Sequence, residues 1–172
     1  MLFVLITDER KKVEGLLKEG KLEGACKALK HNPALETTVY QHIIEMIDGS
    51  LVLNLGKCYF YGKGVAKDMD KAIALIGKAS EMGNDEAMYT LGVCYEVGNG
   101  VKNNAKKAVE LYQRSTNLGN GNAVHNLAMC YRYGKGVDKD IQKSMELFSL
   151  ALSKDCSTLT ALDLSGKNRR KY

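Results

Sequence analysis

The sequence predicts an all-α fold built from three stacked helix pairs. Three glycine-rich loops, each containing Gly-x-Gly-Val, recur at a constant interval of 36 residues: Tyr61–Val65, Val97–Val101 and Tyr133–Val137. A chain that repeats itself at a period between about 20 and 50 residues is usually a stack of small modules that bury their apolar faces against one another. Because such a stack presents an extended surface and no single cleft, the period favours a binding scaffold over an enzyme.

The repeat extends across whole units. Every unit carries a Leu followed by a small residue, a Cys-Tyr pair before the loop, and a Lys followed by Ala or Ser after it. These positions are Leu55-Gly56, Leu91-Gly92 and Leu127-Ala128; Cys58-Tyr59, Cys94-Tyr95 and Cys130-Tyr131; Lys71-Ala72, Lys107-Ala108 and Lys143-Ser144. The predicted units are 51–86, 87–122 and 123–158, without insertion or deletion.

Each unit is predicted to form two helices. In the second unit, Gly98 ends the first helix, since glycine adopts the left-handed cap at little steric cost. Asn104 then offers a side-chain oxygen as the N-cap of the second helix. The small residue at positions 56, 92 and 128 lets the two helices approach closely. The predicted buried faces, at helical spacing, are Ala87, Leu91, Cys94 and Tyr95 in the first helix and Ala108, Leu111, Tyr112 and Ser115 in the second.

These residues resemble a known family. The pattern Ala-x-x-x-Leu-Gly-x-x-Tyr-x-x-Gly-x-Gly-Val, then Asp-x-x-Lys-Ala and Ala/Ser-x-x-x-Gly, is similar to the Sel-one-like repeat (SLR), a relative of the tetratricopeptide repeats. The resemblance covers 51–158 and implies an α/α solenoid, a right-handed superhelix with the first helix of each pair on the concave side. It also implies the family's usual role as adaptor or scaffold. The departures are Leu51, Ser115, Ala128 and Asp155-Cys156, and the last predicts that the array ends there.

The flanking segments are predicted to cap the array. Residues 1–50 are interpreted as an N-terminal helical cap or degenerate repeat, with helical spacing over 8–30 and a second helix ending at Gly49. Residues 159–172 are interpreted as a C-terminal cap and basic tail. The tail supplies four positive charges to a net charge of +5; a solvated end is the favoured interpretation, although nuclear import stays open.

The composition points to a cytoplasmic protein. The apolar start at 1–6 is shorter than the roughly 7–15 residues of a signal-peptide core, and no stretch approaches a membrane span of about 20 residues. Cys58, Cys94 and Cys130 occupy equivalent positions, which are too far apart in neighbouring units for most direct bridges. Free buried thiols in a reducing compartment are therefore expected. No Cys-x-x-Cys or Cys/His cluster suggests a metal or other cofactor.

No catalytic constellation is evident. The histidines are scattered (His31, His42 and His125), and the Gly-x-Gly loops follow helices and lack the remaining residues of phosphate-binding motifs. We therefore expect no enzymatic activity, no small-molecule substrate and no nucleic-acid or membrane partner. A hydrolase, a label that cysteine-rich relatives have carried, is the alternative that the resemblance suggests. Oligomerisation through the apolar segment 159–164 is another.

A partner protein is predicted to bind one stripe along the first helices. The stripe lies opposite the core face, and amides and aromatic rings on it suit contact with a peptide. An alternative is that Asn54 and Asn126 bond to the adjacent helix. The predicted contact residues are Asn54, Lys57, Tyr61, Tyr89, Thr90, Val93, His125, Asn126, Met129 and Tyr133, with Leu53 and Val97 beside them.

Overall fold

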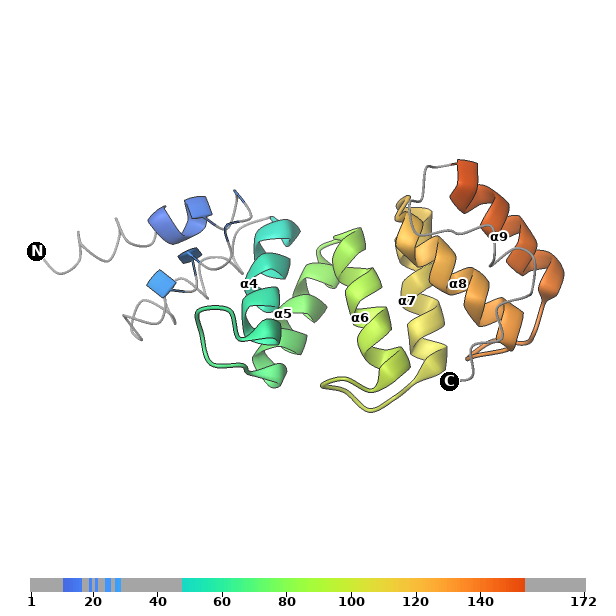
Figure 1. The fold of residues 1–172 in the computed structure, drawn as a ribbon, viewed down its shortest axis with the longest axis horizontal. Helices are drawn as coiled ribbons and strands as arrows, with labels where there is room; N and C mark the ends of the chain where they lie inside the picture. Colours follow the sequence, from blue (N-terminus) through green and yellow to red (C-terminus); the bar gives the residue numbers. More distant parts are fainter. Residues whose placement is uncertain are drawn as a thin grey trace, which may run out of the picture. The chain divides into compact units, whose positions relative to one another are not determined.

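The computed structural model describes residues 11–16, 19, 21, 24, 25, 27, 28 and 48–153. Within these residues the regular structure is entirely helical (Figure 1). The array contains α4 (Gly49–Tyr61), α5 (Met69–Glu81), α6 (Asp85–Val97), α7 (Ala105–Asn117), α8 (Gly121–Tyr133) and α9 (Ile141–Ser153). The all-α prediction is therefore confirmed. The chain divides into two compact units, 1–87 and 88–172, and each is described by itself.

The repeated residues begin and end these helices. The side chains of Asp68 and Asn104 cap α5 and α7, each accepting a hydrogen bond from the backbone N–H three residues ahead. The loop glycines that follow the first helices adopt left-handed conformations, with φ of +66° at Gly62 and +77° at Gly98. The N-cap predicted at Asn104 and the helix end predicted at Gly98 are both confirmed. The same types of N-cap and C-terminal glycine thus recur every 36 residues.

The two helices of a pair meet at the predicted small residue. A Cβ atom added to Gly92 would lie 2.6 Å from Cε1 of Tyr112, and one added to Gly56 would lie 3.0 Å from Cγ1 of Ile76. A larger side chain at either glycine would therefore clash with the bulky residue that the second helix packs against it.

A buried cluster joins successive helices of the second unit. The residues packed around it come from α6, α7, α8, the loop after α8 and α9, so neighbouring repeats share one core, as expected for a stack of modules. The cluster consists of Ala108, Tyr112, Ala123, Leu127 and Cys130, and the partly buried residues against it are Tyr89, Val93, Tyr95, Val109, Tyr131, Val137 and Leu147.

A lysine also covers a tyrosine ring in every repeat. The Nζ atom of Lys107 lies 4.5 Å from the ring centroid of Tyr95, and the equivalent distances are 5.2 Å for Lys71 and Tyr59 and 4.6 Å for Lys143 and Tyr131. Each pair links the first helix of a repeat to the second through a cation–π contact. This contact explains why the Tyr of the Cys-Tyr pair and the Lys after the loop recur together.

Several predictions for the flanks lie outside the described residues. A helix at 11–16 agrees with part of the segment predicted over 8–30. Most of the second N-terminal helix, residues 159–164 and the basic tail are not described. None of the described helices combines the length and apolar character needed to cross a bilayer.

Candidate protein-binding surface

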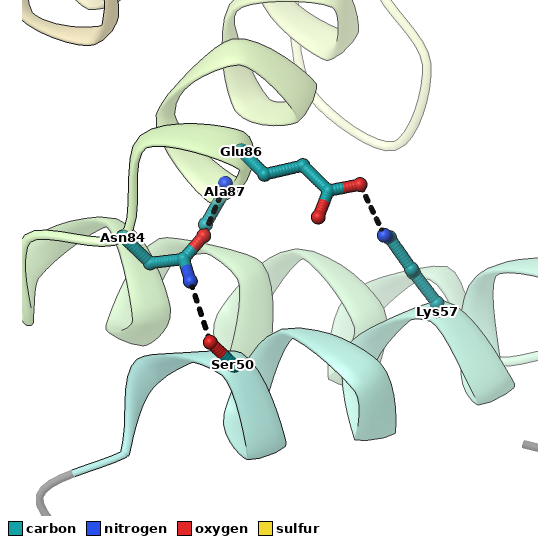
Figure 2. Close-up of polar contacts among 5 residues, drawn as sticks. All are labelled: Ser50, Lys57, Asn84, Glu86 and Ala87. Atoms are coloured by element: carbon teal, nitrogen blue, oxygen red, sulfur yellow. Dashed lines mark hydrogen bonds and ion pairs between the residues drawn. The ribbon is translucent and has the colours of Figure 1, made fainter. Parts of the chain in front are cut away.

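In the first unit, the predicted contact residues differ in their burial and in their contacts with other helices. Nζ of Lys57 lies 2.5 Å from Oε1 of Glu86, so this lysine ties α4 to the first residues of α6 (Figure 2). Asn54 is half-buried. Tyr61, the last residue of α4, leaves 61% of its surface exposed. Lys57 therefore serves packing between repeats, and Tyr61 faces solvent.

Asn84 makes a second link between the same two helices. Its Oδ1 accepts a hydrogen bond from the backbone N–H of Ala87 at 2.8 Å, which caps α6. Its Nδ2 donates to Oγ of Ser50 near the start of α4, at 3.3 Å. Figure 2 shows the amide between the two helices. The dipeptide Gly-Asn recurs at 83–84 and 119–120, and this recurrence was a sequence signal for the cap.

In the second unit, a polar network surrounds the buried ring of Tyr112. The Tyr112 hydroxyl donates to Oε2 of Glu96 at 2.7 Å and accepts from Nδ2 of Asn126 at 3.1 Å. Burial, reinforced by the neighbouring carboxylate, holds the pKa of Tyr112 well above its usual value, so the phenol stays protonated as a donor. Asn126 thus bonds to the adjacent helix, which is the alternative that the sequence had left open for it.

Glu96 has a further contact at the edge of this network. Its Oε1 lies 3.8 Å from Nζ of Lys135 in the loop after α8. Sequence reasoning missed Glu96 because the equivalent positions are Phe60 and Arg132, which share no charge or shape with it. The hydrogen bonds and the ion pair of Glu96 therefore occur in one repeat, and the 36-residue period does not predict them.

The other predicted residues of this unit are partly engaged in packing. Tyr89 and Val93 lie against the buried cluster, and the ring of His125 meets Phe148 edge to face at 5.6 Å. Thr90 and Met129 are half-buried. Of the ten predicted contact residues, Tyr61 and Tyr133 are the exposed ones, with Tyr133 at 53%.

The exposed tyrosines occupy one repeat position. Val97, the equivalent residue of the second repeat, is 65% exposed, so the last residue of α4, α6 and α8 is apolar and open in every case. A cation lies by each tyrosine: Nζ of Lys63 is 5.5 Å from the Tyr61 ring centroid and Cζ of Arg132 is 5.8 Å from that of Tyr133. We call Tyr61, Val97 and Tyr133 the helix-end residues.

The equivalent cysteines differ in state. Cys94 and Cys130 are free and buried, as expected. Burial, with a contribution from Glu96, raises the pKa of Cys130 to about 11. Cys58, by contrast, is disulfide-bonded, and its partner lies outside the described part of the chain. The prediction of a free thiol at Cys58 is wrong, because the spacing argument excluded only bridges between equivalent positions.

Comparisons with known proteins agree with this architecture. The family model described as Sel1 repeat matches residues 52–84, 85–120 and 121–156, more than half of the chain. A Sel1 repeat protein from Oxalobacter formigenes is similar over 70% of this chain and 90% of its own, with 27% identity and a TM-score of 0.64. No curated protein matches.

Two further solved structures share the fold. The c5321 protective antigen of uropathogenic Escherichia coli strains, which displays an SLR fold, is 27% identical over 77% of this chain but only 30% of its own, with a TM-score of 0.65. The Helicobacter pylori cysteine rich protein B is 22% identical over 76% of this chain and 97% of its own, with a TM-score of 0.57. The three repeats and these neighbours confirm the predicted α/α solenoid. The chain belongs to the Sel1 repeat family.

Proposed function

We propose that this chain is a non-enzymatic scaffold that binds a segment of a partner protein along its first helices, α4, α6 and α8. Sel1 repeat proteins generally serve as protein–protein interaction scaffolds. The observation that carries the proposal is the exposure of the helix-end residues Tyr61, Val97 and Tyr133 at one repeat position.

This exposure supports binding because it recurs. A single exposed apolar residue is ordinary in a folded protein. Here three successive repeats place one at the same position, although most of each side chain meets water. Tyrosine also buries a large area for few rotatable bonds, which makes it effective at interfaces. The helix-end residues therefore provide the apolar contacts of the proposed surface.

The remaining predicted residues take a second role in this proposal. Lys57, Tyr89, His125 and Asn126 are held by contacts within the fold, so they position the first helices. The half-buried members of the stripe complete its surface beside the helix-end residues: Asn54, Thr90, Val93 and Met129. Because the surface combines exposed apolar side chains with half-buried polar ones, we propose a polypeptide partner, without a small-molecule, nucleic-acid or membrane ligand.

The cellular compartment of the protein can be tested through the oxidation state of Cys58. The sequence favoured the cytoplasm, partly through free thiols, but disulfides are rare in the cytosol and Cys58 forms one. Thiol alkylation in intact cells, followed by mass spectrometry of the peptide that contains Cys58, tests this point. A cytoplasmic protein should carry the alkylated Cys58 thiol, whereas a protein of an oxidising compartment should keep the disulfide.

The binding proposal is tested by affinity capture from a native lysate. We expect wild-type protein to retain a specific partner that the double variant Tyr61→Ser/Tyr133→Ser loses. The matched control is Leu118→Ser, which changes another exposed apolar residue, at the end of α7. Circular dichroism verifies that all forms are folded. Capture of the same proteins by wild type and the double variant would show that the helix-end residues do not bind the partner.

A further inference from the structure

The α6–α7 and α8–α9 loops of the second unit meet at one end of its helices (Figure 1). Gly136, with φ of +71°, lies so close to the start of α7 that a Cβ there would be 2.3 Å from the carbonyl oxygen of Ala105. Nζ of Lys135 in the same loop lies 3.8 Å from Oε1 of Glu96, near the end of α6. The two loops and the helix ends that they join therefore form one edge, which also carries two of the helix-end residues.

This edge, residues 97–107 and 133–143, is basic. Its first part contains three Lys and no Asp or Glu, and its second part contains three Lys and two Asp, so its net charge is +4. Glu96 and Arg132, which adjoin the edge, cancel each other. The turn between α7 and α8 at the other end of these helices, residues 117–122, has no charged side chain. All six lysines of the basic edge are exposed: Lys102, Lys106, Lys107, Lys135, Lys139 and Lys143.

Some charges of the basic edge have partners within the fold. The Nζ atoms of Lys107 and Lys143 lie over tyrosine rings, and Lys135 forms the ion pair described above. Asp140 accepts a hydrogen bond from the backbone N–H of Lys143 at 2.9 Å, at the start of α9. Its carboxylate is therefore occupied, and Asp138 is the other acid of the edge, exposed to solvent.

The remaining lysines, Lys102, Lys106 and Lys139, form no ion pair with any residue that the structure describes. Lys106 also lies in the first turn of α7, where the helix dipole disfavours a cation. The other repeats form the same helix pairs without a basic residue at the positions of Lys102 and Lys106, so folding does not account for these two lysines. The equivalent residues are Ala66, Asp70, Asp138 and Gln142.

The chemistry of the edge fits a polypeptide that carries both carboxylates and apolar groups. Next to the lysines, Val97 is 65% and Tyr133 is 53% exposed. A single-stranded nucleic acid would match the lysines and the tyrosine, but valine offers no ring on which a base could stack. An acidic peptide segment matches the lysines by charge and both apolar residues by contact.

We propose that the basic edge binds an acidic segment of the partner protein. Lys102, Lys106 and Lys139 face its carboxylates, and Val97 and Tyr133 contact its apolar side chains. This inference rests on the proposed function, because it names the chemistry of the segment that the helix-end residues bind. Exposed ion pairs are weak individually, so several act together, and added salt weakens them.

Fluorescence anisotropy of two labelled synthetic peptides with the whole chain tests the proposal. One peptide repeats Glu-Glu-Leu and the other repeats Gln-Gln-Leu, so they share their leucines and differ in charge. We expect wild type to bind the acidic peptide about tenfold more tightly at low salt, and the difference to shrink as salt is added. Lys102→Glu/Lys106→Glu should weaken binding of the acidic peptide by about tenfold or more and leave the neutral peptide unaffected.

The matched control is Lys78→Glu/Arg114→Glu, which changes the net charge equally by reversing two exposed cations in the last turns of α5 and α7. It should bind the acidic peptide as wild type does, and circular dichroism verifies that all variants are folded. Equal weakening by both double variants would show that overall charge, and not the basic edge, attracts the peptide, and would overturn the proposal. Failure of wild type to bind the acidic peptide would overturn it as well.

A failure of the proposed function gives a different result. Tyr61→Ser/Tyr133→Ser should weaken both peptides, since both carry leucines. If it does so while wild type binds the two peptides equally, the helix-end residues bind a polypeptide, but its acidic character is wrong. If it binds both peptides as wild type does, the helix-end contacts of the proposed function are wrong. Tighter binding of single-stranded DNA than of the acidic peptide, lost in Lys102→Glu/Lys106→Glu, would overturn the acidic-segment proposal in favour of a nucleic acid.

Discussion

In the first unit, Gly56 of α4 faces Ile76 of α5; at the same repeat positions in the second unit, Gly92 faces Tyr112. Both pairs bring the two helices close together through a small residue opposite a large one. The tyrosine, however, also carries a hydroxyl into the core, and Glu96 and Asn126 satisfy it. One exchange at a fixed position therefore converts an apolar contact into a polar node that joins α6, α7 and α8.

The first unit places its polar contacts nearer the surface. Ser50, Lys57, Asn84 and Glu86 connect α4 to the start of α6, and the Lys57–Glu86 pair keeps more than half of the Glu86 side chain in water. The pairing of a small with a large residue thus recurs with the 36-residue period. The polar contacts do not recur: they are buried in the second unit and lie near the surface in the first. Substitutions at the two kinds of contact should therefore differ in cost.

The largest effect is expected where the next repeat approaches α7. Gly136→Ala adds a methyl group against the Ala105 backbone and forces alanine into a left-handed conformation. Strain of this kind and overpacking together should cost about 3 kcal/mol of unfolding free energy. Chemical denaturation measures the loss. Gly77→Ala in the first unit is the control: no atom lies within 4 Å of its added Cβ, so it should be neutral or stabilising. Equal losses in both variants would contradict the close approach.

Removal of the Tyr112 hydroxyl makes the second unit resemble the first. Tyr112→Phe leaves the Glu96 and Asn126 side chains without their shared partner, and we expect a loss of about 2 kcal/mol. Chemical denaturation measures the loss. If Tyr112→Phe left the unfolding free energy unchanged, the hydrogen bonds of the Tyr112 hydroxyl would not contribute to stability.

The same substitution has a pH signature. The folded protein holds the Tyr112 proton more tightly than the unfolded chain does, because its pKa is raised. The stabilisation is therefore complete below the ordinary tyrosine pKa and declines as the pH rises above about 10. The difference in unfolding free energy between wild type and Tyr112→Phe should shrink over that range. A difference that stays constant to high pH would contradict the raised pKa.

The outcome for Tyr112 shows what the sequence could and could not predict. The 36-residue period predicted the helix pairs, Gly98, Asn104 and the small residue opposite Tyr112, because packing and capping impose those residues in every copy. It did not predict Glu96, since a contact made in one repeat leaves no periodic signal. The Lys57–Glu86 pair also left no periodic signal: the equivalents of Lys57 are Val93 and Met129, so nothing repeated pointed to Glu86.

An intermediate effect is expected at Asn84, which belongs to the first unit. Asn84→Ala removes both the cap on α6 and the bond to Ser50, and should lower the unfolding free energy by about 1 kcal/mol. Asn84→Asp keeps the capping oxygen and places a negative charge at the helix N-terminus, so it should recover most of that loss. Thermal unfolding compares the three proteins. If the aspartate variant were as unstable as the alanine variant, the link to Ser50 would matter more than the cap.

The smallest effect is expected at the Lys57–Glu86 pair. Because Glu86 is largely solvated, the pair should stabilise the fold by about 0.5 kcal/mol, and added salt should weaken it. A double-mutant cycle with Lys57→Met and Glu86→Gln isolates this coupling from the packing of the lysine stem. The same variants also separate support from recognition: Lys57→Met should still retain a partner that Tyr61→Ser/Tyr133→Ser loses. If Lys57→Met lost the partner while its stability stayed near that of wild type, Lys57 would be a contact residue, as the sequence suggested, and not a residue that positions α4.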